Sequence, residues 1–453
     1  MATDAQPRGL SRLDDYFGIT RTGSTVRREI MAGTVTFLAM SYVLAVNPGI
    51  LGDGGALGDK GIPMQAVFTA TAVAAVFGTL VMGLWARYPI ALAPGMGLNA
   101  FFAYSVVLGM GIPWQVALSG TFLSGVIFFV LAVTKVRERI LDAIPLQLKL
   151  AVGAGIGLFV AFLGLKNAGI VASSEATFVT LGDFTEGRTL LALFGLVVTI
   201  VFLVKGWHGA VLYGIVLTAV LGIVTGLVDL PSGVAALPRG LDQTFGQAII
   251  HLPDAFTAQM AVVVLTMLFV DFFDASGTLI GVANQAGLLD KQGKLPRAAS
   301  AFAADSVGTT AGAVIGTSTT TAYVESTAGV TAGGRTGLTA VTTAGWFLLA
   351  MFCYPIFSVV AASGEVTAPA LIVVGILMAR SLGQIEWTAL EYSIPAFITI
   401  IMMPLTYSIA NGLAMGMVFY PIVMAARGRI REVHPAMWAL LVVFLGYFFF
   451  LAE

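Results

Sequence analysis

The sequence predicts an all-α polytopic membrane protein, and its low charge, high hydropathy and long apolar runs support this prediction. Only 10% of the 453 residues are charged, whereas soluble domains carry about 25%. Apolar residues make up 58%, the mean hydropathy is +0.93, and the runs are continuous rather than alternating as in a β-barrel. These figures exclude a soluble globule, a disordered chain, a disulfide scaffold and a nucleic-acid binder.

The apolar residues form two series of seven segments, separated by a more polar stretch at 229–257. Because seven is odd, the second series must be inverted in the membrane relative to the first, which is typical of secondary transporters. A further apolar run at 436–451 is short for a span and is interpreted as a helix at the cytoplasmic interface. The predicted spans are 29–50, 65–86, 89–110, 112–134, 145–167, 189–205 and 209–228, followed by 258–283, 296–313, 315–332, 337–362, 367–381, 390–407 and 409–426.

The basic residues predict a cytoplasmic N-terminus and a multi-pass location in the cell membrane. The tail 1–28 is basic and has no signal-peptide pattern, and with this tail inside, every cluster of basic residues falls on the cytoplasmic side. The opposite connections, including 229–257, are mostly acidic or nearly neutral. The cytoplasmic basic positions are Arg87, Lys135, Arg137, Arg139, Lys205, Lys291, Lys294, Arg297, Arg335, Arg380, Arg427, Arg429 and Arg431.

Two spans are interrupted at corresponding places in the two series. Pro94, Gly95 and Gly97 argue against regular helix in the third span, and a run of threonine and serine at 317–321 does so in the tenth. Extended backbone is tolerated at membrane depth only where it is buried or lines a cavity, so the two short strands are expected to pair. The helices that follow, starting near Gly97 and Thr321, then direct their N-termini at one central place. Two ordinary kinked helices remain the alternative.

Carboxylates in these central spans indicate a functional site. Asp271 lies near the middle of the eighth span, and Asp274 and Thr278 continue its helical face. A charge at this depth costs several kcal/mol and persists mainly for function. Glu325 is expected in the first turn of the tenth-span helix. Asp274 could instead be structural, and Glu325 a simple capping residue.

The remaining candidate residues for binding lie in the two interrupted spans. Asn99 offers a donor and an acceptor in the third span, with a helix cap as the alternative. Leu98 is counted among the binding residues, and Tyr323 is expected to present its ring to the cavity unless it only packs in the core. Several carboxylates without a nearby lysine or arginine suit a cation or a ligand rich in N–H donors. The three histidines show no ligand spacing, so neither a metal site nor a cofactor is expected.

The three central motifs resemble those of the AzgA-like purine permeases, which belong to the wider nucleobase transporter superfamily. The resemblance covers essentially the whole chain and is carried by 93–104, 270–279, 316–330 and the start 13–23. It implies proton-coupled transport of adenine, guanine and hypoxanthine. It also implies fourteen spans, an elevator-like motion of a core domain against a gate domain, and a tendency to form homodimers.

The resemblance also assigns roles to individual residues. Asp271 matches the eighth-span carboxylate that contacts the base, Glu325 matches the acidic or amide residue of the tenth span, and Tyr323 matches an aromatic residue of uracil-transporting relatives. Asn99 and Asp274 match polar residues implicated in the AzgA-like group. Ala275 stands where some uracil-transporting relatives have a histidine, so proton coupling is assigned to Asp271, Asp274 and Glu325.

The domain boundaries follow from this scheme. The expected parts are a cytoplasmic tail at 1–28, core halves at 29–134 and 258–362, gate halves at 140–228 and 366–426, an extracellular linker at 229–257, and a tail at 427–453. Other interpretations stay open: the same architecture serving a pyrimidine, xanthine or a small anion, a membrane-embedded aspartyl protease, or a channel. An anion site should have a basic residue beside it, a protease needs aspartates on adjacent helices, and a channel needs repeated polar rings.

Overall fold

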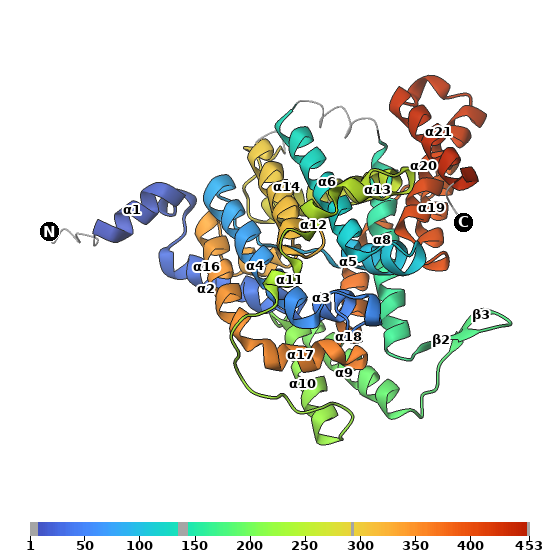
Figure 1. Ribbon diagram of the computed structural model, residues 1–453. Helices are drawn as coiled ribbons and strands as arrows, with labels where there is room; N and C mark the ends of the chain where they lie inside the picture. Colours follow the sequence, from blue (N-terminus) through green and yellow to red (C-terminus); the bar gives the residue numbers. More distant parts are fainter. Residues whose placement is uncertain (1–7, 135–143, 291–293, 451–453) are drawn as a thin grey trace.

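The computed structural model describes residues 8–134, 144–290 and 294–450 and is mostly helical (Figure 1). Lys135, Arg137, Arg139 and Lys291, used above to predict the orientation, lie outside the described residues. The helices and strands of the first half are α1 Arg8–Phe17, α2 Val26–Met40, α3 Val43–Leu51, α4 Met64–Val81, β1 Leu92–Pro94, α5 Met96–Ala100, α6 Trp114–Val133, α8 Leu146–Asn167, β2 Val171–Ser174, β3 Phe178–Leu181, α9 Gly187–Val204 and α10 Ala210–Val224.

The second half repeats much of this order. Its elements are α11 Leu241–Thr244, α12 Gln247–Ile250, α13 Ala258–Gln285, α14 Ala298–Ile315, β4 Thr320–Ala322, α15 Ser326–Thr331, α16 Gly337–Ala350, α17 Tyr354–Ala362, α18 Gly364–Met378, α19 Leu390–Leu405, α20 Ile409–Ala426 and α21 Pro435–Phe450. Wider π-helical turns at Met82–Ala86 and Phe101–Gly109 extend α4 and α5.

The described helices confirm a polytopic membrane protein. Nine helical stretches in the described part of the chain are long and apolar enough to cross a membrane, the longest being Ala258–Gln285 with 28 residues. The helix α21 packs against α20 and buries Met437 and Phe444. Outside the spans, the backbone N–H and the hydroxyl of Thr20 donate to Asp14, which holds the pKa of this carboxyl below its usual value.

The two predicted short strands are present and pair with each other. β1 and β4 are antiparallel, with Leu92 opposite Ala322 and Pro94 opposite Thr320. The ladder continues beyond both ends, since Gly95 N donates to Thr319 O at 2.9 Å and Tyr323 N donates to Ala91 O at 3.0 Å. Buried backbone groups of two interrupted spans therefore satisfy one another, as membrane depth requires.

Two details of the predicted elements were wrong. The helix of the tenth span begins at Ser326 rather than near Thr321, because residues 320–322 pair with β1 and leave Glu325 at the N-cap position. A hairpin, β2–β3, follows α8, so the chain is not all-α outside the interrupted spans. Its second strand, FVTL, is rich in β-forming residues, whereas the first, VASS, has only its valine. Figure 1 shows the hairpin projecting from the helical body.

The helix contacts of the two halves correspond to each other. In this correspondence α2, α4 and α6 of the first half match α13, α14 and α16 of the second. Accordingly, α4 packs against α16 and α14 against α6, while α2 packs against α16 and α13 against α6. In the other part of the molecule, α8 contacts α19 as α18 contacts α9, and α8 and α18 pack on each other. At that crossing, a Cβ on Gly157 would come 2.9 Å from Gly375 O, so the close approach requires glycine.

Candidate functional site

A cavity of about 710 Å³ lies beside the paired strands. One side is formed by α2, β4 and α13 together with the segments next to the strands, including Gly95–Leu98 and Tyr323–Glu325. The other side comes from α8, α18 and the turn between α9 and α10. Most lining side chains are apolar, and Asp274 and Glu325 are the only carboxylates among the lining residues described.

Glu325 is held in this cavity by a tyrosine that the sequence analysis missed. Tyr42 OH donates to Glu325 Oε1 at 2.6 Å, across a sequence separation of 283 residues. Tyr42 lies at the break between α2 and α3, is 1% exposed and lines the same cavity. The bond occupies one carboxylate oxygen and fixes the direction of the other.

Asp274 and Thr278 reach the cavity from α13, as their shared helical face predicted. Both line the wall together with Phe273 and Gly277. A Cβ added at Gly277 would meet nothing within 4 Å, so the helix surface is open at this level. The cavity therefore has two carboxylate side chains, Asp274 on α13 and Glu325 directly before α15, and Phe273 of α13 also lines it.

Asp271 does not line this cavity. It is 1% exposed and lies among α13, α14 and β4, where Thr309 Oγ1 donates to its Oδ2 at 3.0 Å. Its other oxygen, Oδ1, has no hydrogen-bond partner. The structure thus separates the two aspartates of α13, with Asp274 in the cavity and Asp271 one layer behind it.

A second buried aspartate, Asp305, escaped the sequence analysis. It is fully buried on α14, and its Oδ1 accepts a hydrogen bond from Ala322 N of β4 at 2.8 Å. Its Oδ2 has no partner. Asp305 lies near the middle of the predicted span 296–313. The criterion that identified Asp271, a carboxylate at mid-membrane depth, could therefore also have identified Asp305.

Asn99 is fully buried but belongs to a polar network behind the cavity. Its amide donates to Asn47 Oδ1 at 2.5 Å, and Ser318 Oγ donates to its oxygen. Asn47 in turn donates to Thr71 and Thr317 at 2.6 and 3.0 Å. Neighbouring Leu98 lines the cavity, so of these two predicted residues only Leu98 reaches it.

Tyr323 lines the cavity and also fastens the strand pair. Its hydroxyl donates to Pro94 O at 2.5 Å, and the residue is 5% exposed. The ring therefore stands in the wall, with its polar end directed at β1. Asp274, Thr278, Leu98, Tyr323 and Glu325 come together in the cavity, whereas Asp271 and Asn99 remain behind it.

Basic side chains also line the cavity. They are Lys149 at the start of α8, His208 in the turn before α10 and Arg380 after α18. The expectation that no lysine or arginine is near the carboxylates was therefore wrong for the cavity as a whole. Within the described residues, no group of three or more histidine, cysteine, aspartate or glutamate side chains could hold a metal ion.

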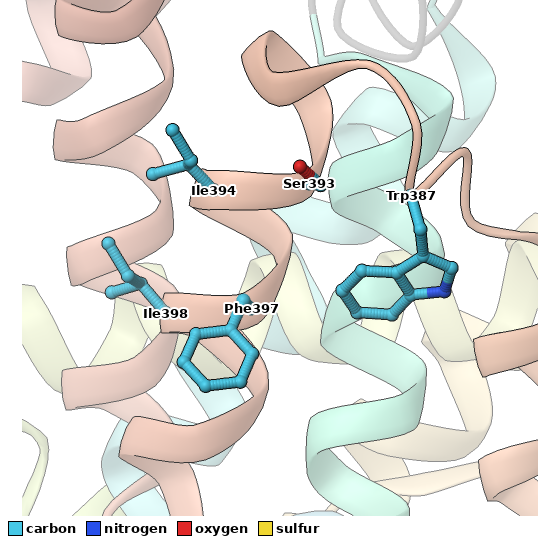
Figure 2. Close-up of a pocket in the computed structure, with 5 residues that line it drawn as sticks. All are labelled: Trp387, Ser393, Ile394, Phe397 and Ile398. Carbon is cyan, nitrogen blue, oxygen red and sulfur yellow. The ribbon is translucent and has the colours of Figure 1, made fainter.

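A separate groove on the outside of α19 has a different character. Figure 2 shows Ile394, Phe397 and Ile398 on this helix with Trp387 beside them. Among the described lining residues, the polar groups are the Ser393 hydroxyl and the indole N–H of Trp387, which already donates to Leu382 O. A groove of this composition cannot satisfy a polar substrate, so the cavity at the strands is the candidate site.

Comparison with known proteins identifies the family. The profile Xan_ur_permease, described as Permease family, matches residues 27–445. The chain belongs to this permease family. The guanine/hypoxanthine permease PbuG of Bacillus subtilis is 54% identical over 442 residues, covering 96% of this chain and 99% of that protein. The adenine permease AdeP of Escherichia coli is 40% identical over 440 residues, covering 97% of this chain and 96% of that protein.

Solved structures support the same type of fold. The transmembrane domain of the cyanobacterial bicarbonate transporter BicA superposes with a TM-score of 0.61 at 16% identity, over 85% of this chain and 97% of that one. SLC26A9 superposes with a TM-score of 0.59 at 10% identity, over 94% of this chain and 72% of that one. The chain is therefore a multi-pass membrane permease of the nucleobase transporter superfamily, and members of this family are transporters rather than enzymes.

Proposed function

We propose that this chain imports purine nucleobases by proton symport, with guanine and hypoxanthine as its main substrates and adenine as a further one. The observation that carries the proposal is the pair of cavity carboxylates, Asp274 and Glu325, set in a mostly apolar wall. PbuG is named a guanine/hypoxanthine permease and AdeP an adenine permease, which supports the same class of substrate.

The chemistry of a 6-oxopurine fits these acceptors. Guanine carries N1–H and an exocyclic NH₂ on one edge, and a carboxylate accepts both in a bidentate manner. Hypoxanthine keeps N1–H but lacks the amino group. Adenine has an acceptor at N1, so an ionised Glu325 suits it less well. The flat ring can pack on Tyr323 or Phe273.

The same carboxylates argue against a small anion as the substrate. A bicarbonate-sized anion beside Asp274 and Glu325 would be repelled at low dielectric, although Lys149 and Arg380 line the same cavity. The likeness to BicA therefore concerns the fold, while the site is suited to N–H donors.

We further propose fourteen spans in two inverted sets of seven and an elevator-like motion between core and gate. The corresponding helix contacts of the two halves support the repeat. The cavity supports the division, because Tyr42, Asp274 and Glu325 come from the predicted core halves at 29–134 and 258–362. Ile156 and Met378 come from the predicted gate halves at 140–228 and 366–426.

Base contact and proton coupling are proposed to lie on different residues. Glu325 and Asp274 bind the base in the cavity, with Leu98, Thr278 and Tyr323 shaping it, while Asp271 behind the wall carries the proton. Asn99 acts through its network with Asn47 rather than by touching the base. No cofactor is required, since the proton gradient supplies the driving force. A homodimer in the membrane is proposed from the family resemblance alone.

Uptake by purified protein in proteoliposomes tests the proposal. Radiolabelled guanine and hypoxanthine should accumulate when the outside is acidic, and unlabelled uracil or bicarbonate should not compete. Glu325→Gln turns an acceptor into a donor, which costs about 1–3 kcal/mol, or roughly tenfold to a hundredfold in affinity. Asp242→Asn, an exposed carboxylate in the predicted extracellular linker, is the matched control. Equal base affinity in Glu325→Gln and wild type would remove the cavity from the mechanism.

A further inference from the structure

Beyond the cavity, α8 continues into a cluster of aromatic side chains. Ile156 of α8 lines the cavity, and one turn further along the helix Phe159 is fully buried. The ring centre of Phe159 lies 5.8 Å from that of Tyr407, which connects α19 and α20. The rings of Tyr104 and Phe162 lie 5.7 Å from the same tyrosine, and all three contacts are edge-to-face. Tyr407 is therefore the centre of this cluster.

The aromatic cluster closes one end of the cavity. None of its four side chains is among the described residues that line the cavity. In the opposite direction along α8, the lining continues from Ile156 to Lys149, which is two turns or about 10 Å. Midway along this stretch, a Cβ on Gly153 would come 3.8 Å from Ser381 Oγ, and Gln384, which follows Ser381 in the lining, is exposed. The cavity is therefore open towards the start of α8 and blocked towards its end, which is predicted to lie on the extracellular side.

Tyr407 connects parts of the chain that belong to different proposed domains. Tyr104 and Ser105 lie in the first predicted core half, whereas Tyr407 lies in the second predicted gate half. Ser105 is 5% exposed, and its Oγ donates a hydrogen bond to Tyr407 O at 3.2 Å. Lys166 of α8, an exposed residue, places its Nζ 5.0 Å from the centre of the Tyr407 ring. The tyrosine is thus held by the core through Tyr104 and Ser105 and by α8 of the gate domain.

Two features of Tyr407 oppose this closed arrangement. Its φ is 54°, a left-handed conformation that bulky residues rarely adopt and that persists only where the surroundings enforce it. Its hydroxyl is buried and has no hydrogen-bond partner among the described residues. The ring contacts and the hydrogen bond from Ser105 therefore hold Tyr407 in a state that costs free energy, and this cost is released when the core moves away.

We propose that Tyr407 is the extracellular gate of the transport path. While the core lies against it, the tyrosine blocks the cavity from the extracellular side. When the core moves, the hydrogen bond from Ser105 and the contact with Tyr104 break, and the Tyr407 hydroxyl becomes hydrated. The inference rests on the proposed function, since a gate requires a transporter, and it adds the residue that determines to which side the cavity opens.

Two conservative variants should shift this gate in opposite directions. Ser105→Ala removes the hydrogen bond that holds the gate closed, whereas Tyr407→Phe keeps the ring and removes the unpartnered hydroxyl that opposes closure. A reporter cysteine, Phe162→Cys in a Cys353→Ser background, is labelled by an impermeant thiol reagent added outside intact cells. Labelling should become about twofold to tenfold faster in Ser105→Ala and slower by a similar factor in Tyr407→Phe. The control variant Tyr16→Phe should leave the labelling rate unchanged.

A covalent link across the gate provides a second readout. In the double variant Tyr104→Cys/Tyr407→Cys, again in the Cys353→Ser background, a bifunctional thiol reagent should join the two positions, whose rings lie 5.7 Å apart in the native protein. The linked protein should lose purine uptake and exchange. It should still bind guanine in detergent, because the cavity stays open towards Lys149. Each single-cysteine variant should transport equally well before and after treatment with the reagent.

The opposite outcomes separate the possible failures. Labelling that changes in the same direction in Ser105→Ala and Tyr407→Phe, or in neither, would overturn the gate, as would a cross-linked protein that still transports. Labelling of Phe162→Cys from the cytoplasmic side alone would overturn the extracellular position of the cluster. Opposite shifts in a protein that binds no purine would leave the gate in place and refute the proposed function instead.

Discussion

Removing the hydroxyl of Tyr42 tests how Glu325 is held for its substrate. In Tyr42→Phe the ring remains, so packing at the α2–α3 break is kept and only the 2.6 Å hydrogen bond to Glu325 Oε1 is lost. A hydrogen bond to a charged group contributes about 1.5–3 kcal/mol. Because Glu325 lines the cavity, water can replace part of this bond, so the lower end applies. We expect guanine and hypoxanthine to bind roughly tenfold more weakly.

The same variant should also alter selectivity. Without the donor, the Glu325 carboxylate is no longer held in one orientation, which weakens its acceptance of guanine N1–H and NH₂. Adenine has an acceptor at N1 and depends less on this arrangement, so adenine affinity should fall less than guanine affinity and the guanine-to-adenine ratio should drop. Competition for radiolabelled guanine binding to purified protein measures both affinities. Tyr16→Phe is the matched control, since Tyr16 OH also donates one hydrogen bond, to Leu84 O at 2.8 Å, away from the cavity. An unchanged ratio in Tyr42→Phe would refute the role of this bond.

Three further predictions concern motion, stability and orientation. A Cβ at Gly97 would collide with Ile156 Cγ2 of α8, so Gly97→Ala should reduce turnover several-fold more than base affinity. Exchange assays should show partial rescue by Ile156→Ala, which removes the colliding Cγ2. Glu29 is fully buried and accepts hydrogen bonds from Arg335 N, Thr336 N and Thr339 Oγ1. Glu29→Gln should therefore reduce the free energy of unfolding by about 2 kcal/mol or more and lower the melting temperature in detergent. Glu175→Gln, at an exposed position, should leave the melting temperature unchanged. In a Cys353→Ser background, an impermeant thiol reagent added to intact cells should label Asp242→Cys but not Asp15→Cys; the reverse pattern would contradict the cytoplasmic N-terminus.

The interrupted spans were predictable because their signal is local. Pro94 cannot donate a helical hydrogen bond, and consecutive β-branched threonines disfavour helix. The residues of each segment therefore predict extended backbone without any knowledge of the strand with which it pairs. The register of Leu92 with Ala322 adds the long-range part, and the later start of α15 follows from it. Residues 320–322, which the sequence analysis placed at the start of the tenth-span helix, pair with β1 instead.

Contacts across long sequence separations could not be predicted in this way. Tyr42 and Glu325 are 283 residues apart, and nothing near Tyr42 in the sequence marks it as a partner of a carboxylate. The network of Asn47, Asn99 and Ser318 likewise joins three spans whose order in space the sequence does not state. An isolated polar residue in an apolar run indicates that a partner exists without indicating which residue it is.

The two aspartates of α13 show what helical periodicity can and cannot decide. Residues three apart on an α-helix are rotated by about 60° relative to each other, so Asp271 and Asp274 were correctly expected near one face. However, α13 lies at the boundary between the cavity and the interior, where it contacts α8 on one side and α14 on the other. At such a boundary a 60° rotation is enough to direct Asp274 to the cavity and Asp271 into the wall, where it accepts a hydrogen bond from Thr309. Sharing a helical face therefore does not imply sharing an environment, which is why we propose different roles for the two aspartates.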